Sequence, residues 1–407
     1  MAAGRDPQVS AAPARRLLPV VIAAYAFWIN MVGTTLPTPL YPLYSRQLGI
    51  TSLTITVIFA TYAIGVVVSL VLFGRLSDEV GRRPVLLGGL LASAASAVAF
   101  LLAQDLLVLL IGRALSGLSA GIFTGTATAT IIDLSDAHTR KRAGGLAAAA
   151  NLGGLGCGSL FSGLLASFAP APLRLSYAID LGLVVLALVA LALMLPETVP
   201  RKPRMRLQPQ RLNVPRQARG VFIRAAAAGS CSFAVSSLYG AVMPGFLTQD
   251  LHLKSPALAG FLVFLLFGLA VGGQFSAARL PERIALPGGS ATLGVGAALL
   301  TLAVALKSFP ILLLAAAVTG LGQTVAISAG LAALGARSPA GQRGEVASSF
   351  FVVLYCALAF PIVAVGLATQ FAALRSIAII FGIIVTAICA FVVVSFMEEL
   401  RRPTVAQ

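Results

Sequence analysis

The sequence predicts an all-α integral membrane protein, with twelve transmembrane helices arranged as two pseudo-symmetric six-helix bundles. Three observations lead to this fold class. First, 58% of the 407 residues are hydrophobic and only 10% are charged, whereas a soluble domain of this length needs far more charge to cover its surface. Second, the apolar residues form runs of about 20, the length that crosses a bilayer as a helix. Third, a basic, proline-containing stretch follows the sixth run.

The expected spans follow these runs in chain order. The first, 17–40, comes after two arginines, but it is too long for a cleaved signal peptide and ends in Pro-Thr-Pro-Leu-Tyr-Pro instead of a small-residue cleavage site. The other spans are expected at 52–74, 84–104, 106–132, 143–168, 175–195, 221–246, 256–277, 285–306, 309–335, 345–368 and 372–397.

A linker at 198–219 divides the chain into two halves. It is rich in arginine, and its prolines discourage a continuous helix. Six expected spans lie on each side of it, and the segment Gly273–Arg283 after span 8 is a weak echo of the loop after span 2. We therefore expect an N-terminal tail at 1–16, a bundle at 17–197, the cytoplasmic linker, a second bundle at 220–400 and a tail at 401–407.

The net charge of +16 is explained by topology. With both termini in the cytoplasm, all but six of the 29 Lys and Arg residues fall on the cytoplasmic side, as the positive-inside rule requires. We expect a multi-pass protein of the plasma (bacterial inner) membrane that contacts anionic lipid at its cytoplasmic face. No nucleic-acid recognition motif accompanies the charge, so no nucleic-acid partner is expected. The six exceptions are Arg46, Arg113, Arg174, Lys254, Lys307 and Arg375.

The most specific motif is the hydrophilic hairpin between spans 2 and 3. It reads Gly-Arg-Leu-Ser-Asp-Glu-Val-Gly-Arg-Arg from Gly74 to Arg83, and a stretch this charged must lie outside hydrocarbon. Gly81 permits the sharp reversal of the chain. The pattern resembles the loop signature of the major facilitator superfamily, and the arrangement of six spans, linker and six spans resembles its twelve-helix drug:proton antiporters. The resemblance implies a secondary transporter with its binding site near mid-membrane, between the halves.

The same resemblance implies a gate at the cytoplasmic mouth. Asp78 matches the loop aspartate that holds the halves together against the start of the eleventh helix, here around Gly344–Ser348, where a helix N-terminus favours a carboxylate. Asp133 and Asp136 match the acidic partners of the loop arginines, Arg82 and Arg83. The alternative is that these charges only anchor loops at the headgroups.

Arg113 in span 4 is the clearest charge inside the membrane. It opens Arg-Ala-Leu-Ser-Gly, which resembles the Arg-x-x-Gln-Gly signature of proton-linked facilitators, with Ser116 in place of glutamine. A structural tie to backbone carbonyls is the alternative role. After it, Gly117 and Gly121 begin a stripe of small residues that favours close helix contact.

Asp180 is the only carboxylate expected well inside a span. Because a carboxyl group in apolar surroundings holds a proton more readily than one in water, we expect Asp180 to be able to carry a proton. A neighbouring Arg113 would oppose this, and the sequence leaves open whether the two meet. The alternative is a polar residue near the outer end that reaches water and takes no part in proton chemistry.

Span 5 contains a glycine pattern that resembles the family's antiporter signature, Gly-x-x-x-Gly-Pro-x-x-Gly-Gly. Gly154, Gly158 and Gly163 match it, whereas Ser159 replaces the proline and Ser162 the first of the paired glycines. These departures leave open a metabolite importer or uniporter of the same fold. Such glycines also serve as ordinary packing residues in membranes.

The substrate cavity is expected to be apolar and aromatic, with scattered hydroxyl and amide groups. The resemblance implies that helices 1, 4, 7 and 10 line it. Pockets of this composition bind hydrophobic or amphiphilic molecules, and no lysine or arginine is expected at mid-membrane, where it would clamp a phosphate or dicarboxylate. The candidate cavity residues are Phe27, Asn30, Met31, Thr34, Ser236, Tyr239, Met243, Gln323 and Tyr355.

The leading hypothesis is therefore an exporter of small lipophilic, drug-like compounds in exchange for protons, working as a monomer without a cofactor. A membrane enzyme or a sensor is the third possibility. Against an enzyme, the only histidines, His138 and His252, fall in expected loops, and no metal-ligand spacing or nucleophile–base pair is present. The isolated cysteines fit small core residues.

Overall fold

The computed structural model describes residues 13–136, 139–199, 209–277 and 279–401, and in this part of the chain helices are joined by turns and loops, with no strand. Twelve of its helical segments are long and apolar enough to cross a membrane. Large apolar side chains of the spans, such as Phe360 and Phe391, are exposed on the outside, which suits a surface facing lipid. The predicted fold class is confirmed, and the chain is a multi-pass membrane protein.

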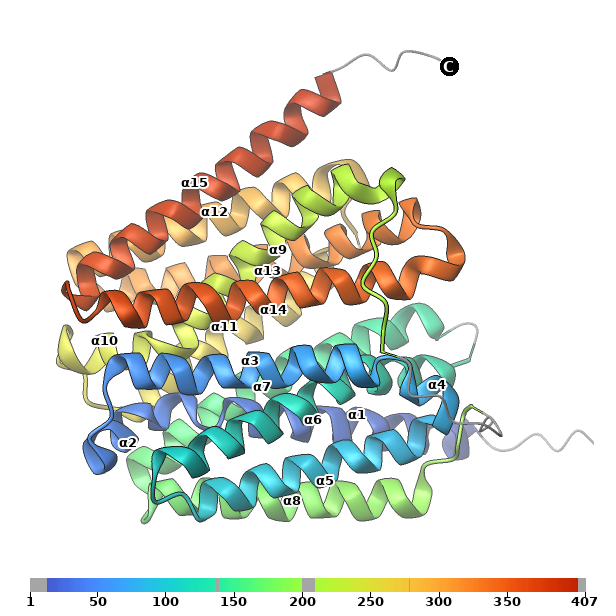
Figure 1. Cartoon of the computed structure of the whole chain (residues 1–407), viewed down its shortest axis with the longest axis horizontal. Helices are drawn as coiled ribbons and strands as arrows, with labels where there is room; N and C mark the ends of the chain where they lie inside the picture. The colour runs from blue at the N-terminus through green and yellow to red at the C-terminus, as the bar shows by residue number, and fades with distance from the viewer. Residues whose placement is uncertain (1–12, 137–138, 200–208, 278, 402–407) are drawn as a thin grey trace, which may run out of the picture.

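The helices form two layers that lie one above the other in Figure 1. The lower layer contains α1 (Pro13–Thr35), η1 (Thr38–Leu40), α2 (Tyr41–Leu48), α3 (Ser52–Phe73), α4 (Leu76–Val80), α5 (Arg82–Leu101), α6 (Leu106–Asp133), α7 (Arg140–Phe168) and α8 (Pro172–Met194). The upper layer contains η2 (Arg216–Ala218), α9 (Arg219–Ala241), α10 (Met243–Gln249), α11 (Pro256–Ala277), α12 (Glu282–Leu306), α13 (Phe309–Arg337), η3 (Ala340–Gln342), α14 (Arg343–Ala368) and α15 (Leu374–Arg401).

The two ends of the molecule differ. The end that carries α4 and the linker between α8 and α9 is called the linker end, and the opposite end, with α2 and α10, is called the far end (Figure 1). Most expected spans match long helices to within a few residues. The first and seventh differ, because each breaks near the far end and continues as a short second helix, α2 or α10.

Prolines account for these two breaks. Pro37 and Pro39 lie between α1 and α2, and Pro244 occupies the first turn of α10, where a missing N–H is tolerated. Each break lies near the far end of the first span of its half, so the similarity between the two halves includes the broken first helix. Helices α2 and α10 also contact each other across the halves.

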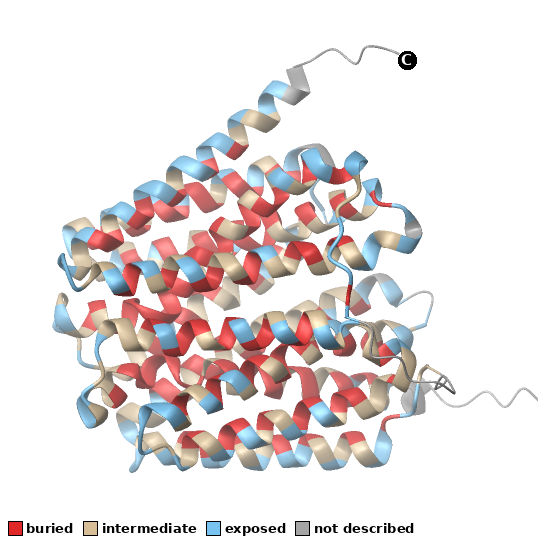
Figure 2. Ribbon diagram, viewed as in Figure 1, coloured by how far each residue is buried: buried red, intermediate tan, exposed pale blue. Residues whose placement is uncertain are grey.

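Two helix pairs, α3 with α14 and α7 with α11, carry most of the contact between the halves. At the far end the approach is very close. Gly366 of α14 lies so near Thr56 of α3 that an added Cβ would be 2.9 Å from the Thr56 Cβ, and Gly163 of α7 meets Pro256 at the start of α11. Figure 2 shows buried residues concentrated on the inner faces of both layers.

Candidate functional site

A cavity of about 400 Å³ lies between the two halves. Helices α1, α3, α6 and α7 wall it on one side and α9, α11, α13 and α14 on the other. It extends from Thr38, near the break after α1, to Thr128, Gly144 and Leu331, which belong to the linker-end turns of their helices. The tight contacts at the far end and the extension toward the linker end indicate a state in which the halves are closed at the far end.

Five of the nine candidate cavity residues line this space. They come from both halves: Met31, Thr34, Ser236, Gln323 and Tyr355. In the second half the hydroxyl of Ser236 donates to the Gln323 side-chain oxygen at 2.8 Å, which fixes the orientation of that amide. The wall is otherwise dominated by aliphatic and aromatic side chains.

The other four candidates lie outside the lining. Phe27 packs against Phe123 with ring centroids 6.2 Å apart, and the side-chain oxygen of Asn30 accepts a hydrogen bond from Ser119. Tyr239 and Met243 are buried completely. Helical periodicity had placed them on the cavity face, but neighbouring helices cover them.

Several polar lining residues escaped the sequence analysis because they lie on helices that were not expected to contribute. Asn151 comes from α7 and Gln274 from α11, and the hydroxyl of Ser328 donates to the Gln274 side-chain oxygen at 2.8 Å. One feature of the sequence pointed to Gln274 as a residue of interest: it directly follows Gly273, the first residue of the segment that echoes the loop after span 2.

Arg113 is the only charged side chain that lines the cavity in the described part of the chain. It is 1% exposed, and it donates to the Thr34 carbonyl oxygen at 2.7 Å and to the Tyr41 hydroxyl at 2.6 Å. The guanidinium carbon also lies 5.5 Å from the ring centroids of both Phe59 and Tyr62, within cation–π range. Arg113 therefore places a basic side chain in the cavity wall, where none was expected to face a substrate.

Asp180 lies elsewhere. It is 3% exposed on α8 and does not line the cavity; it faces Gly33 of α1, where an added Cβ would be 3.0 Å from its Oδ2. Its Oδ1 is buried without a hydrogen-bond partner. Among the described residues no ion pair joins Asp180 to Arg113, which answers the question that the sequence left open.

The hairpin of Gly74–Arg83 is organised around Arg82. Its guanidinium lies 2.7 Å from an Asp78 oxygen and 3.3 Å from an Asp133 oxygen, and it also donates to the Ser77 hydroxyl at 2.7 Å. The loop is thus tied to the linker end of α6. The Asp78 side chain is 59% exposed, so its ion pair lies at the surface.

Glu197, just beyond the end of α8, holds the same hairpin through its backbone. Its carboxylate accepts hydrogen bonds from the backbone N–H groups of Arg82 at 2.7 Å and Arg83 at 3.3 Å. Gly81 has φ +106°, and an added Cβ would overlap the Glu197 carboxylate. The Arg83 side chain donates to the Ala192 carbonyl oxygen near the end of α8.

Linker residue Gln210 occupies the region where Asp78 was expected to meet the start of α14. It is buried, and its backbone N–H donates to the Val71 carbonyl oxygen at 2.7 Å. Its side chain lies beside Gly74 and Gly344, since a methyl group added at either glycine would be 3.6 Å or 3.8 Å, respectively, from an atom of Gln210. In this state the linker, and not Asp78, bridges the ends of α3 and α14.

The candidate packing glycines lie at close helix contacts. An added Cβ at Gly117 or Gly121 would overlap α3, and one at Gly154 or Gly158 would overlap α1. Ser159, which replaces the signature proline, donates its hydroxyl to the Thr35 carbonyl oxygen at 3.2 Å, and α7 runs unbroken past it.

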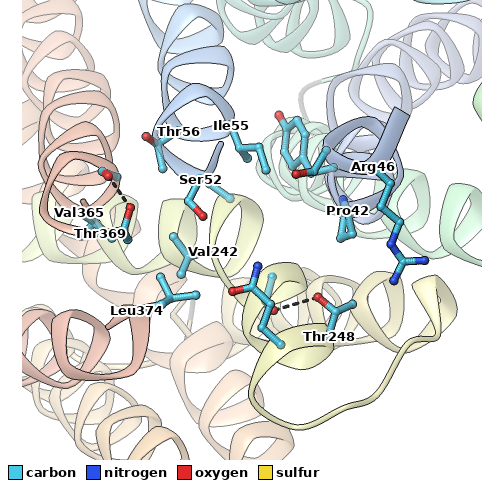
Figure 3. A pocket seen from close by; sticks show the side chains of 16 residues that line it. Pro42, Arg46, Ser52, Ile55, Thr56, Val242, Thr248, Val365, Thr369 and Leu374 are labelled. Carbon is cyan, nitrogen blue, oxygen red and sulfur yellow. Dashed lines mark hydrogen bonds between the residues drawn. The ribbon is translucent and has the colours of Figure 1, made fainter. Parts of the chain in front are cut away.

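A second cavity, of about 230 Å³, lies between the halves at the far end. Figure 3 shows Arg46 of α2, Thr56 of α3, Thr248 of α10 and Thr369 beyond α14 around it. In the described part of the chain no group of three or more His, Cys, Asp or Glu could hold a metal ion.

Comparisons with known proteins agree with this geometry. The family model described as Major Facilitator Superfamily matches residues 23–303. The quinolone resistance protein NorA of Staphylococcus aureus is 24% identical over 123 residues, which is 30% of this chain and 32% of NorA. The inner membrane transport protein YajR of Escherichia coli is 30% identical over 118 residues, or 29% of this chain and 26% of YajR. The matches thus span about a third or less of these relatives.

Two solved structures share the fold along nearly the whole chain. The human organic anion transporter MFSD10 (TETRAN) has a TM-score of 0.67 at 19% identity, covering 94% of this chain and 100% of that one. A bacterial homologue of the human lysosomal transporter Spinster, in an inward-facing and unoccupied conformation, has a TM-score of 0.69 at 15% identity, covering 97% and 100%. These two structures show the fold of the chain, and the family match indicates a transporter.

Proposed function

Because the chain belongs to the Major Facilitator Superfamily, we propose that it is a secondary active transporter that exports small hydrophobic or amphiphilic compounds in exchange for protons. One observation carries the proposal: the mainly apolar cavity between the halves, which extends toward the linker end while the far end is closed. Its size and lining suit lipophilic molecules held by a few polar groups. The similarity to NorA, a quinolone resistance protein, supports drug-like cargo.

The orientation in the membrane is part of the proposal. The distribution of Lys and Arg supports a linker end in the cytoplasm of a bacterial cell, from which the cavity would load. The basic linker end would contact anionic lipid. The protein would act as a monomer and draw its energy from the proton gradient.

We further assign the gate to the Gly74–Arg83 hairpin. When the linker end closes, Asp78 would approach the N-terminus of α14, where a carboxylate gains about 0.3–1 kcal/mol. Asp78→Asn should therefore slow transport without preventing membrane insertion. Normal transport by a well-inserted Asp78→Asn protein would remove this role.

The direct test uses purified protein in liposomes with an imposed pH gradient and an internal pH dye. Quinolones and a panel of lipophilic dyes are added, and substrate-dependent proton movement is recorded. Proton flux in exchange for cargo supports the antiporter. Cargo movement without proton flux contradicts the coupling and favours a uniporter.

The variant Asp180→Asn tests the proton carrier in the same liposomes. The asparagine keeps the shape of the side chain but cannot release a proton. We expect substrate exchange across the membrane to continue while uphill movement driven by the pH gradient is lost. Unchanged uphill transport would remove Asp180 from the mechanism.

A second candidate function is transport of an amphiphilic organic anion, as an importer or uniporter. Arg113 favours it, because its buried charge in the cavity wall has no carboxylate partner among the described residues, and a bound anion would supply one. The printed name of MFSD10, an organic anion transporter with the same fold, fits this possibility.

Naphthoate and its uncharged methyl ester distinguish the two candidates. If the cavity binds anions, Arg113→Gln should weaken naphthoate binding about ten- to a hundredfold, the range expected for a lost charged hydrogen bond, and leave the ester unaffected. Equal binding of both probes by the wild-type protein contradicts the anion transporter.

A further inference from the structure

Two buried ionisable side chains, Arg113 and Asp180, contact consecutive residues of α1. Arg113 reaches the carbonyl oxygen of Thr34 from the cavity side, at 2.7 Å. Asp180 faces the preceding residue, Gly33, from α8. Thr34 therefore contacts Arg113, the only charged side chain that lines the cavity among the described residues. The residue before it, Gly33, contacts the carboxyl group of Asp180, which lies outside the cavity.

The absence of a side chain at Gly33 brings Asp180 against the α1 backbone. A methyl group there would lie 3.0 Å from Oδ2 and 3.5 Å from Oδ1, tighter than the usual van der Waals separation for the first contact. The carboxyl group thus helps to set the distance between α1 and α8 at this level. Because Oδ1 has no hydrogen-bond partner, the present arrangement does not stabilise a negative charge there.

The surroundings of Asp180 contain no compensating charge in the described part of the chain. From α1, Tyr25 is the titratable group on this side, and its hydroxyl donates to the Leu183 carbonyl oxygen at 3.2 Å. On α8 itself, Tyr177 lies one turn earlier. The membrane-spanning parts of α5 and α7 carry no acidic or basic side chain toward it.

We propose that Asp180 is a proton site separate from the substrate cavity, and that α1 transmits its protonation state to Arg113 through Gly33 and Thr34. This inference rests on the proposed proton-coupled transport and gives it a route. In the structure the carboxyl group fits closely against Gly33, an arrangement that suits its neutral form. Loss of its proton creates a charge that needs water or a donor, so α1 and α8 must separate locally. Thr34 moves with α1 and changes the position of the Arg113 guanidinium.

A pair of tyrosine hydroxyls lies between the far end and the turn of α8 before Asp180, and we include it in the proposed route as the entry for the proton. The Tyr177 hydroxyl lies 3.3 Å from that of Tyr44, and Tyr44 lines a third cavity near the far end together with Arg174. Tyr177 also stacks on Phe100 with centroids 4.8 Å apart. The variant Tyr177→Phe keeps this stack and removes only the hydroxyl, so it should slow proton delivery from the far side. An unchanged rate contradicts this path.

The first experiment measures the proton at Asp180 without a substrate. The full-length protein in lipid is titrated while infrared difference spectra record the stretching band of protonated carboxyl groups. We expect a titrating band that is absent in Asp180→Asn. In Gly33→Ala the midpoint pH of this band should be displaced. Gly182→Ala is the control and should match the wild type, because Gly182 lies on α8 with Asp180 and its added methyl meets no atom within 4 Å.

The second experiment measures the response of α1. Trp28 is the only tryptophan of the chain, lies on α1 and contacts Gly153 and Gly154 of α7. Its fluorescence should change over the same pH range as the infrared band, and the change should be lost in Asp180→Asn. A Trp28 titration that persists in Asp180→Asn overturns the inference.

These outcomes separate the inference from the proposed function. Proton-coupled transport in liposomes, combined with no infrared band assigned to Asp180, leaves the antiporter intact and refutes the proton site. Loss of binding of a lipophilic dye in Asp180→Asn refutes the separation of proton site and cavity. A wild-type protein without proton flux in the liposome assay refutes both the antiporter and this route.

Discussion

Gly81 illustrates how one backbone position fixes the hairpin at the linker end. Its φ of +106° lies in a region that other residues rarely adopt, and the Glu197 carboxylate fills the space where a side chain would begin. The carboxylate is held there by the N–H groups of Arg82 and Arg83. The backbone conformation and the position of the Glu197 carboxylate therefore both require glycine at position 81.

Gly81→Ala should destabilise the protein by about 1–3 kcal/mol, the usual cost of a strained backbone position. Thermal unfolding in detergent measures the effect. Gly88→Ala on α5 is the matched control, because its methyl meets no atom within 4 Å and should be neutral or stabilising. Gly49→Ala, at φ +66° in open space, isolates the backbone strain. If Gly81→Ala melts like Gly88→Ala, the account of the hairpin is wrong.

Sequence reasoning succeeded at single residues whose chemistry is unusual for their surroundings. Asp180 and Arg113 stood out because ionisable groups are costly in hydrocarbon. Their partners could not be predicted, since Gly33 meets Asp180 across 147 positions of the chain and local periodicity contains no information on such contacts. For the same reason Phe27 and Asn30 were assigned to the cavity although α6 covers them.

Among the elements, the spans were predictable because a bilayer demands about 20 apolar residues in a helix. The breaks after α1 and α9 were not assigned, although the prolines were visible, because a proline near a helix end is compatible with either a stop or a restart. The position of Gln210 between α3 and α14 could not be predicted, because no pattern in the neighbouring sequence indicates it.

The contact of α14 with α3 at the far end makes a prediction for these elements. A methyl at position 366 would overlap the Thr56 hydroxyl, which donates to the Leu53 carbonyl oxygen at 2.7 Å and so resists rotation. Gly366→Ala should therefore weaken the far-end closure and favour the state that is open there.

The shift is measured by labelling from the far side. Ser236→Cys places a thiol in the main cavity, and a membrane-impermeant maleimide should react faster in the Gly366→Ala background than in the parent. Gly268→Ala on α11, with no atom within 4 Å of the added methyl, is the control. An unchanged labelling rate would show that this contact does not seal the far end. The native thiols replaced beforehand are Cys157, Cys231, Cys356 and Cys389.

At the scale of the whole molecule, the orientation in the membrane determines from which side cargo can enter the observed cavity. This side follows from which side of the membrane the linker end faces, because the cavity extends to that end. The basic residues of short loops govern orientation during insertion. Their concentration at the linker end predicts that this end is cytoplasmic, and hence that cargo is loaded from the cytoplasm.

Reporter fusions test this orientation. Green fluorescent protein fused after Gln407 should fluoresce, and alkaline phosphatase inserted in the far-end loop at 251–255 should be active, because that enzyme needs an oxidising compartment to form its disulfides. Phosphatase inserted at Asn213 in the linker is the matched control and should be inactive. The reverse pattern would place the cavity mouth outside the cell, and the closed far end would then face the cytoplasm. The observed state would then accept cargo from outside the cell, and exported cargo would have to be loaded in the other state.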